Sequence, residues 1–254
     1  MRVSELKIDT RRKKILDLLE QRGKVSVTQL SNEFNTSSVT IRSDLSFLEE
    51  SGCWERVKGR AVLIPHVKNM DRAIVNQAEK RAIGLRVARV VQDSDTIFMN
   101  SGTTNLMIAQ ALKEHKNLNI VTSSLAVANE LSDIPTFHVI LLGRNLNVQY
   151  RFTSGVDVQE QLSKYAAKYA ILSVDGVSLE HGITTYHADE VIISKMMAEK
   201  ASRLIVGADH RIIDRVGFSH ICSLNQLYTL VTDDKAPEGT LKELRLQGIR
   251  VIVS

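Results

Sequence analysis

From residue 79 onward, helical patterns alternate with short runs rich in Val and Ile. The strand-like runs are 95–99, 118–122, 137–143, 169–176, 204–209, 228–234 and 250–253. The helical patterns are 79–92, 104–113, 125–131, 189–203 and 240–247. This alternation predicts a mainly parallel sheet covered by helices on both faces, and the stretch 144–168 reads as irregular.

Polar residues follow the first of these strands, at the sheet edge where ligands bind in α/β folds. Hydroxyls beside the amides of a helix start, with a glycine that allows close backbone approach, suit a phosphate. The run lacks the lysine of a Walker loop and the three glycines of a dinucleotide fingerprint. An alternative is that the hydroxyls only cap the helix. The predicted effector contacts are Asn100, Ser101, Gly102, Thr103, Thr104 and Asn105.

Two further strand ends carry polar residues in the same setting. An aspartate there accepts hydrogen bonds from sugar hydroxyls while hydroxyls and amides hold a phosphate, which predicts a phosphorylated-sugar pocket. The Asp-Gly pair alone is equally explained by turn chemistry. The additional predicted contacts are Thr122, Ser123, Ser124, Asp175, Gly176 and Lys195.

The first 64 residues contain three helical patterns, at 11–21, 26–34 and 37–50, followed by two strand-like runs, 53–57 and 61–64. Ser26 with Gln29 forms a capping box for the second helix. Helix, helix, turn, helix and hairpin in this order predict a winged helix-turn-helix.

The third helix has the polarity of a DNA-recognition helix. At 100° per residue its apolar residues Ile41, Leu45 and Leu48 cluster on one side, opposite small polar residues and an arginine, with Val39 at the edge of that polar face. Such a face enters the major groove, although an ordinary solvated surface has the same composition. The predicted DNA contacts, including the hairpin tip, are Ser37, Ser38, Thr40, Arg42, Ser43, Ser46, Lys58 and Arg60.

The charge supports this interpretation. The net charge of +4 arises within residues 1–70, which hold 13 Lys and Arg against 9 Asp and Glu. A basic module joined to a neutral one indicates a nucleic-acid partner. An RNA-binding module is disfavoured because this region has no aromatic stacking platform.

The sequence disfavours membrane, secreted, disulfide-bonded and metal-binding classes of protein. There is no apolar run long enough for a membrane span and no secretory h-region at the N-terminus. Cys53 and Cys222 lie far apart, and the seven histidines form no HExxH-type pair. We therefore expect a cytoplasmic protein without a disulfide, metal or cofactor, and without a membrane partner.

The chain resembles the DeoR family of bacterial regulators over nearly its whole length. "TIRSDLSFLEESG" and "RVKGRAVL" match the family's DNA-binding module. "SGTTN", "TSSLAVANEL", "SVDGVS…HGITT" and "GAD" match, in order, its sensor domain. The resemblance implies an α/β sensor domain related to ribose-5-phosphate isomerase, with residues 101–105 and 122–124 on the phosphate side and Asp175 beside the sugar.

Several positions depart from the family pattern. Ser43 replaces the second arginine of the usual Arg-Arg pair, and "VKGR" replaces the usual His-Gly-Gly at the start of the wing. Arg144 stands where a second glycine is common. Arg211 to Ile213 stand where the family has Ser-Lys-Phe, so the effector preference is expected to differ from that of relatives.

The predicted organisation is a winged helix-turn-helix at 1–64, a linker at 65–78 and an α/β sugar-phosphate sensor domain at 79–254. The resemblance implies a repressor of a sugar-catabolic operon that binds double-stranded operator DNA and releases it when a phosphorylated sugar binds. We expect a homodimer or homotetramer, because one head reads too few base pairs. The alternative is a sugar-phosphate isomerase with an appended head, for which Asp175, Asp189 and Glu190 are the candidate bases.

Overall fold

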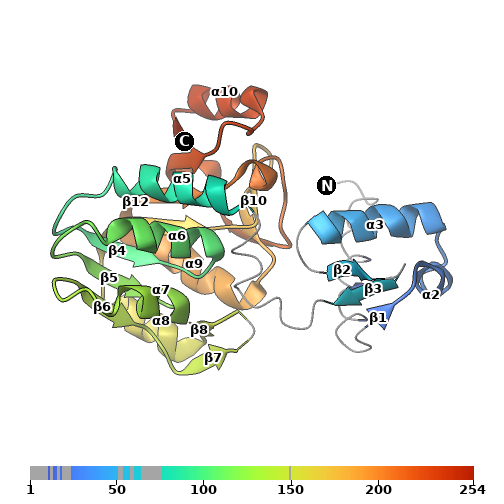
Figure 1. Ribbon diagram of the computed structural model, residues 1–254, viewed down its shortest axis with the longest axis horizontal. Coiled ribbons are helices and arrows are strands. Elements are labelled where there is room, and N and C mark those ends of the chain that lie inside the picture. The colour runs from blue at the N-terminus through green and yellow to red at the C-terminus, as the bar shows by residue number, and fades with distance from the viewer. Residues whose placement is uncertain are drawn as a thin grey trace. The chain divides into compact units, whose positions relative to one another are not determined.

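The computed structural model describes residues 11, 14, 15, 18, 24–50, 54–57, 60–63, 76–148 and 150–254 (Figure 1). Side chains are described at 11, 14, 15 and 18, for residues 25–46, and from residue 76 onward, except at 149. The chain forms two compact units, Met1–Val67 and Lys68–Ser254, and each is described by itself. No helix in the described ranges is both long and apolar enough to cross a membrane.

The first unit combines helices with a small antiparallel sheet. Its elements are α2 (Val27–Glu33), α3 (Ser38–Glu50), β1 (Lys24–Val25), β2 (Trp54–Val57) and β3 (Arg60–Leu63). The strands pair in the order β1-β3-β2. The hairpin was predicted from its sequence, whereas β1 was missed because two residues are too few to show an alternating pattern.

The helices of this unit are fixed by a cap and an apolar core. The Ser26 hydroxyl accepts from the Gln29 amide at 3.2 Å while the Gln29 side chain accepts from the Ser26 amide, which confirms the capping box. The core consists of Ile15, Val25, Leu30, Ile41 and Leu45. The inward placement of Ile41 and Leu45 turns the opposite side of α3 toward solvent.

The second unit is built on seven parallel strands in the order β15-β14-β12-β9-β4-β5-β6. They are β4 (Thr96–Met99), β5 (Asn119–Thr122), β6 (His138–Leu141), β9 (Ala167–Ser173), β12 (Ala201–Gly207), β14 (Leu227–Thr232) and β15 (Arg250–Val253). All six pairings are parallel, which confirms the predicted mainly parallel sheet.

Helices cover both faces of this sheet. On one face lie α5 (Gln77–Ala88), α6 (Thr103–Leu112) and α7 (Leu125–Leu131); on the other lie α8 (Val156–Ser163), α9 (Ala188–Lys200) and α10 (Glu238–Leu246). The two apolar cores alternate along each strand: Phe98 belongs to one, and its neighbours Ile97 and Met99 belong to the other. A strand buried on both faces reads as a continuous apolar run, as these do.

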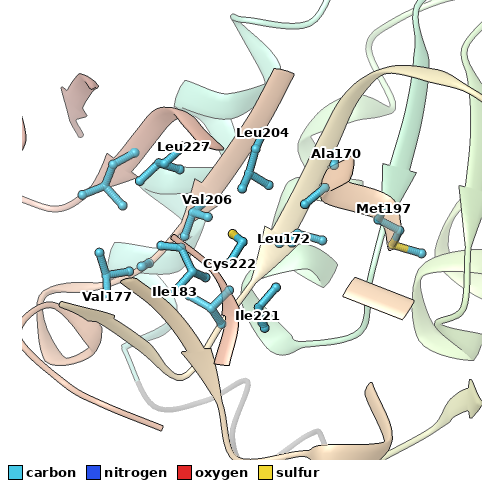
Figure 2. Packing of buried hydrophobic residues seen from close by; sticks show 14 of the residues in the cluster. Ala170, Leu172, Val177, Ile183, Met197, Leu204, Val206, Ile221, Cys222 and Leu227 are labelled. Atoms are coloured by element: carbon cyan, nitrogen blue, oxygen red, sulfur yellow. The ribbon is translucent and has the colours of Figure 1, made fainter. Parts of the chain in front are cut away.

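Smaller elements complete the unit. They are β7 (Asn145–Asn147) with β8 (Phe152–Ser154), the sheet of β10 (Gly176–Ser178), β11 (Gly182–Thr185) and β13 (Ser219–Cys222), and the 3-10 turns His210–Ile212 and Leu224–Gln226. Figure 2 shows Val177 and Ile183 of the small sheet beside Val206 of β12 and Cys222 of β13. The interpretation of 144–168 as irregular was wrong, because it holds β7, β8 and α8.

The predicted helix 189–203 also ends too late. The structure ends α9 at Lys200, and Ala201 already pairs with Ala167 of β9. Ser202 and Arg203, the second and third residues of β12, are polar and exposed, so no change in hydrophobicity marks the boundary.

The strand order reverses direction at the centre of this sheet. The chain runs from β4 outward through β5 to β6, and the later strands add on the other side of β4, beginning with β9. At such a reversal the loops after the two central strands diverge and leave a crevice at the carboxyl edge. The loops after β4 and β9 and the first residues of α6 contain most of the residues predicted to bind the effector, and Thr122, Ser123 and Ser124 lie at the end of the neighbouring β5.

Candidate functional site

Asn100 links the two central strands at the carboxyl edge of the sheet. Its Nδ2 donates to the Ser173 carbonyl (3.0 Å) and the Ser194 hydroxyl (3.1 Å), while its Oδ1 accepts from the Ser173 amide (2.9 Å). The Asn105 Nδ2 donates to the Asn100 carbonyl and to the Ile171 carbonyl. Both asparagines are buried and fix the shape of the loop, so their predicted contact with the effector remains a prediction.

Gly102 begins α6 in a conformation that favours glycine. Its φ is +130°, and an added Cβ would lie 2.4 Å from the Ser173 hydroxyl. The loop therefore packs directly on the end of β9. The first amides of α6 have no partners within the helix and point toward this edge, which is the geometry of an anion site.

Lys80 supplies a cation that the sequence analysis missed. Lys80 is 6% exposed, and its Nζ donates to the Thr103 hydroxyl at 2.9 Å. The lysine comes from α5, on the same stripe as the buried Ile83 and Val87. That position was a usable signal, because a lysine on the buried face of a helix requires a polar destination.

Glu190 lies at the same loop. It is 5% exposed, and its Oε1 accepts from the Ser101 amide at 2.9 Å. Burial raises the pKa of Glu190 to about 7; the hydrogen bonds from Ser101 lower this pKa, and the charge of Asp175 raises it. A carboxyl group that is half ionised near neutral pH thus faces the loop.

Asp175 lies near Glu190 at the end of β9. Its Oδ2 accepts from the Thr185 hydroxyl (2.8 Å) and from the Tyr186 amide (2.9 Å). Gly176 starts β10, where a Cβ would meet the Thr184 hydroxyl and the Arg215 carbonyl. Asp175 is held in a fixed orientation, and Gly176 serves close strand packing.

The loop after β5 contributes mostly to its own structure. The Thr122 hydroxyl donates to the Met99 carbonyl (2.7 Å), and the Ser124 hydroxyl caps α7 by accepting from the Val127 amide (3.2 Å). The Ser123 hydroxyl is buried and has no hydrogen-bond partner in the described part of the chain. Ser123 is thus the residue of this loop whose hydroxyl is uncommitted.

The side chains of Thr104 and Lys195 point away from the residues gathered at the carboxyl edge of β4, β5 and β9. The Thr104 methyl group would lie 3.2 Å from a Cβ at Gly207, so this side chain packs toward β12. The Lys195 side chain is 58% exposed and pairs with Glu199 at 3.9 Å. The buried Ser194, one position before Lys195, reaches the loop from α9, as Glu190 does.

The ends of β12 and β14 extend the polar edge. Arg211 pairs with Asp209 at 3.0 Å, and the His210 Nδ1 lies 2.9 Å from Asp233. Burial raises the pKa of Asp209, but hydrogen bonding and charge from Arg211, with the charge of Lys80, outweigh burial and lower it. Arg211, in the place of the family's Ser-Lys-Phe, is thus committed to an aspartate.

In the first unit, α3 presents the predicted DNA-facing surface. Ser38, Arg42 and Ser43 are exposed, Thr40 and Ser46 are half-buried, and Ser37 precedes the helix. Val39, expected at the edge of this face, is 71% exposed. The side chain of Arg60 in β3 is not described, and Lys58 lies outside the described residues.

Asp44 holds α3 against the first helical segment. It is buried, and its Oδ2 accepts from the Nε of Arg11 at 2.6 Å. This ion pair was not predicted, because Arg11 and Asp44 are far apart in sequence. It fixes the helix from the side opposite Arg42 and Ser43.

Each of the two units matches a known domain family. Residues 11–67 match the DeoR-like helix-turn-helix domain and residues 75–234 the DeoR C terminal sensor domain. The regulator GolR of Listeria innocua is 31% identical, covering 96% of this chain and 98% of its own length. The repressor GlcR of Bacillus subtilis is 31% identical over 94% of each chain, and the glycerol-3-phosphate regulon repressor of Escherichia coli is 29% identical over 91% and 92%.

Solved structures give partial alignments. Ribose 5-phosphate isomerase from Plasmodium falciparum aligns with a TM-score of 0.40 and 13% identity over 53% of this chain and 52% of that chain. The assignment rests on the family matches and the full-length relatives. The chain belongs to the DeoR family of DNA-binding transcriptional regulators.

Proposed function

We propose that this regulator represses a sugar-catabolic operon and is released from its operator by a phosphorylated sugar bound at the carboxyl edge of β4, β5 and β9. The observation that carries the proposal is the meeting of the buried Lys80 with Thr103 at the start of α6. A desolvated lysine and a helix N-terminus together form an anion site suited to phosphate.

The remaining groups of the site suit the sugar. Asp175 and Glu190 provide carboxylate acceptors for hydroxyl groups, and the uncommitted Ser123 hydroxyl provides a further partner. One relative is named the glycerol-3-phosphate regulon repressor, and glycerol 3-phosphate is a small phosphorylated polyol. The effector must favour a state whose paired heads no longer match the operator. We therefore propose a dimer or tetramer, acting in the cytoplasm.

Lys80→Met is expected to abolish the effector response and leave operator binding intact. Methionine keeps the length of the buried side chain but removes the charge, which weakens phosphate binding by roughly 10- to 100-fold. A thermal-shift screen against phosphorylated and free sugars measures this, since a ligand that binds only the folded state raises the midpoint. Lys164→Met, at an exposed position of the same unit, is the control. Equal shifts for wild type and Lys80→Met would disprove the phosphate site.

Arg42→Ala is expected to weaken operator binding without unfolding the protein, because Arg42 is exposed on α3. We expect a loss of about 1–3 kcal/mol in binding free energy. Fluorescence anisotropy with labelled duplex measures the affinity over a range of salt concentrations. The exposed Lys164→Ala in the sensor unit is the control. Unchanged affinity of Arg42→Ala would contradict the predicted orientation of the recognition helix.

One observation favours a second function, sugar-phosphate isomerisation. Glu190, with a pKa of about 7, has the ionisation behaviour of a general base. The purified protein is therefore to be assayed with ribose 5-phosphate and amino-sugar phosphates. Turnover that Glu190→Gln abolishes would establish the enzyme, and absence of turnover leaves the sensor.

A further inference from the structure

Val39 is a large apolar side chain in an unexpected place. It is the second residue of α3 and is 71% exposed, whereas Ile41 and Leu45 of the same helix are buried. A single exposed valine is ordinary on a protein surface. Val39 differs from an ordinary exposed valine because it shares its helix face with residues predicted to contact DNA.

The helical spacing places Val39 within the DNA-facing surface. Residues three, four and seven positions apart share one face of a helix, and from Val39 these positions are Arg42, Ser43 and Ser46. At 100° per residue Val39, Ser43 and Ser46 lie within about 60° of one another. The valine is therefore inside the polar stripe, on the side opposite the buried Asp44.

The hydroxyls of Ser37 and Thr40 are already engaged at the start of the helix. The Ser37 hydroxyl accepts from the Thr40 amide at 3.1 Å and lies 2.8 Å from the Thr40 hydroxyl. Ser37 therefore caps α3, and Thr40 supports that cap. These contacts leave Val39 as the largest exposed side chain of the first turn.

We propose that Val39 reads the 5-methyl group of a thymine in each operator half-site. In the major groove thymine presents a methyl group, a feature that the other three bases lack. An exposed β-branched side chain is a fitting partner for that methyl, while Ser38, Arg42 and Ser43 supply polar contacts around it. This inference rests on the DNA-binding function and assigns part of its sequence specificity.

The test uses the full-length protein and its own preferred duplex, selected from a randomised pool. Each thymine of that duplex is replaced in turn by deoxyuridine, which lacks only the 5-methyl group. For wild type we expect one methyl-sensitive thymine in each half-site, with an affinity loss of about fourfold, the factor for one buried methyl-sized group. Val39→Ala should bind the unmodified duplex more weakly by a similar factor and lose all sensitivity at that thymine.

Val148→Ala is the matched control, because Val148 is 75% exposed in the sensor unit. It should retain the wild-type response at every thymine. A scan without a methyl-sensitive thymine, or one whose sensitivity persists in Val39→Ala, would overturn the assignment of Val39 alone. Failure of the pool to enrich any sequence would instead overturn sequence-specific DNA binding, and this inference with it.

Discussion

Asp44→Ala is expected to unfold the DNA-binding unit while the sensor unit stays folded. The substitution leaves the largely buried Arg11 guanidinium without the carboxylate that accepts its 2.6 Å hydrogen bond. Removing one partner of a buried ion pair costs about 3 kcal/mol or more. Because a unit of this size has only a few kcal/mol of stability, most molecules would lose the fold that presents α3.

The chain carries its own probe for this measurement. Trp54, the single tryptophan, is in the DNA-binding unit, and all five tyrosines lie beyond residue 149. Urea denaturation followed by tryptophan fluorescence therefore reports the first unit selectively. Asp44→Asn keeps an acceptor for Arg11 and should lose less stability. Arg42→Ala, on the exposed side of the same helix, should leave the transition unchanged. A wild-type transition in Asp44→Ala would show that the ion pair does not support the fold.

Glu190→Gln is expected to make the sensor unit more stable at alkaline pH relative to wild type. The pKa of Glu190 is about 7 in the folded protein against a usual 4.5. The folded state thus holds its proton more strongly than the unfolded state. The contribution of protonated Glu190 to the free energy of unfolding is therefore full below about pH 4.5 and is lost as the pH rises through about 7. Between pH 5 and pH 8 the wild type should lose roughly 2–3 kcal/mol that Glu190→Gln retains.

Denaturation at several pH values, followed by tyrosine fluorescence, tests this difference. Glutamine can still accept the hydrogen bond from the Ser101 amide, so the loop geometry is preserved. Glu114→Gln, at an exposed position, should follow the wild-type pH dependence. Parallel pH profiles for wild type and Glu190→Gln would mean that Glu190 titrates as an ordinary surface carboxylate.

The main sheet was predictable because strands buried on both faces produce long apolar runs between helical patterns. The small sheets of the sensor unit were not predictable, since their strands mix buried polar with apolar positions, as in Gly182–Thr185, and so lack the apolar runs of the main sheet.

The sequence indicated which loops form the candidate site, but it identified only some of the residues that meet there. Strand ends with hydroxyls led to Ser101, Thr103, Ser123 and Asp175, which the strand order brings to one edge. The sequence could not show that the Asn100 side chain joins β4 to β9, because that depends on strands far apart in the chain. For the same reason the convergence of Lys80 from α5 and Glu190 from α9 on this loop was visible only in the fold.

The central claim is that a phosphate bound beside Lys80 controls operator binding. It is tested most directly by titrating labelled operator with the regulator in the presence of individual sugar phosphates and their unphosphorylated sugars. The account predicts that one phosphorylated sugar weakens operator affinity by about tenfold or more, that its free sugar does not, and that Lys80→Met is insensitive to both. An effect of equal size from the free sugar, or in Lys80→Met, would contradict it.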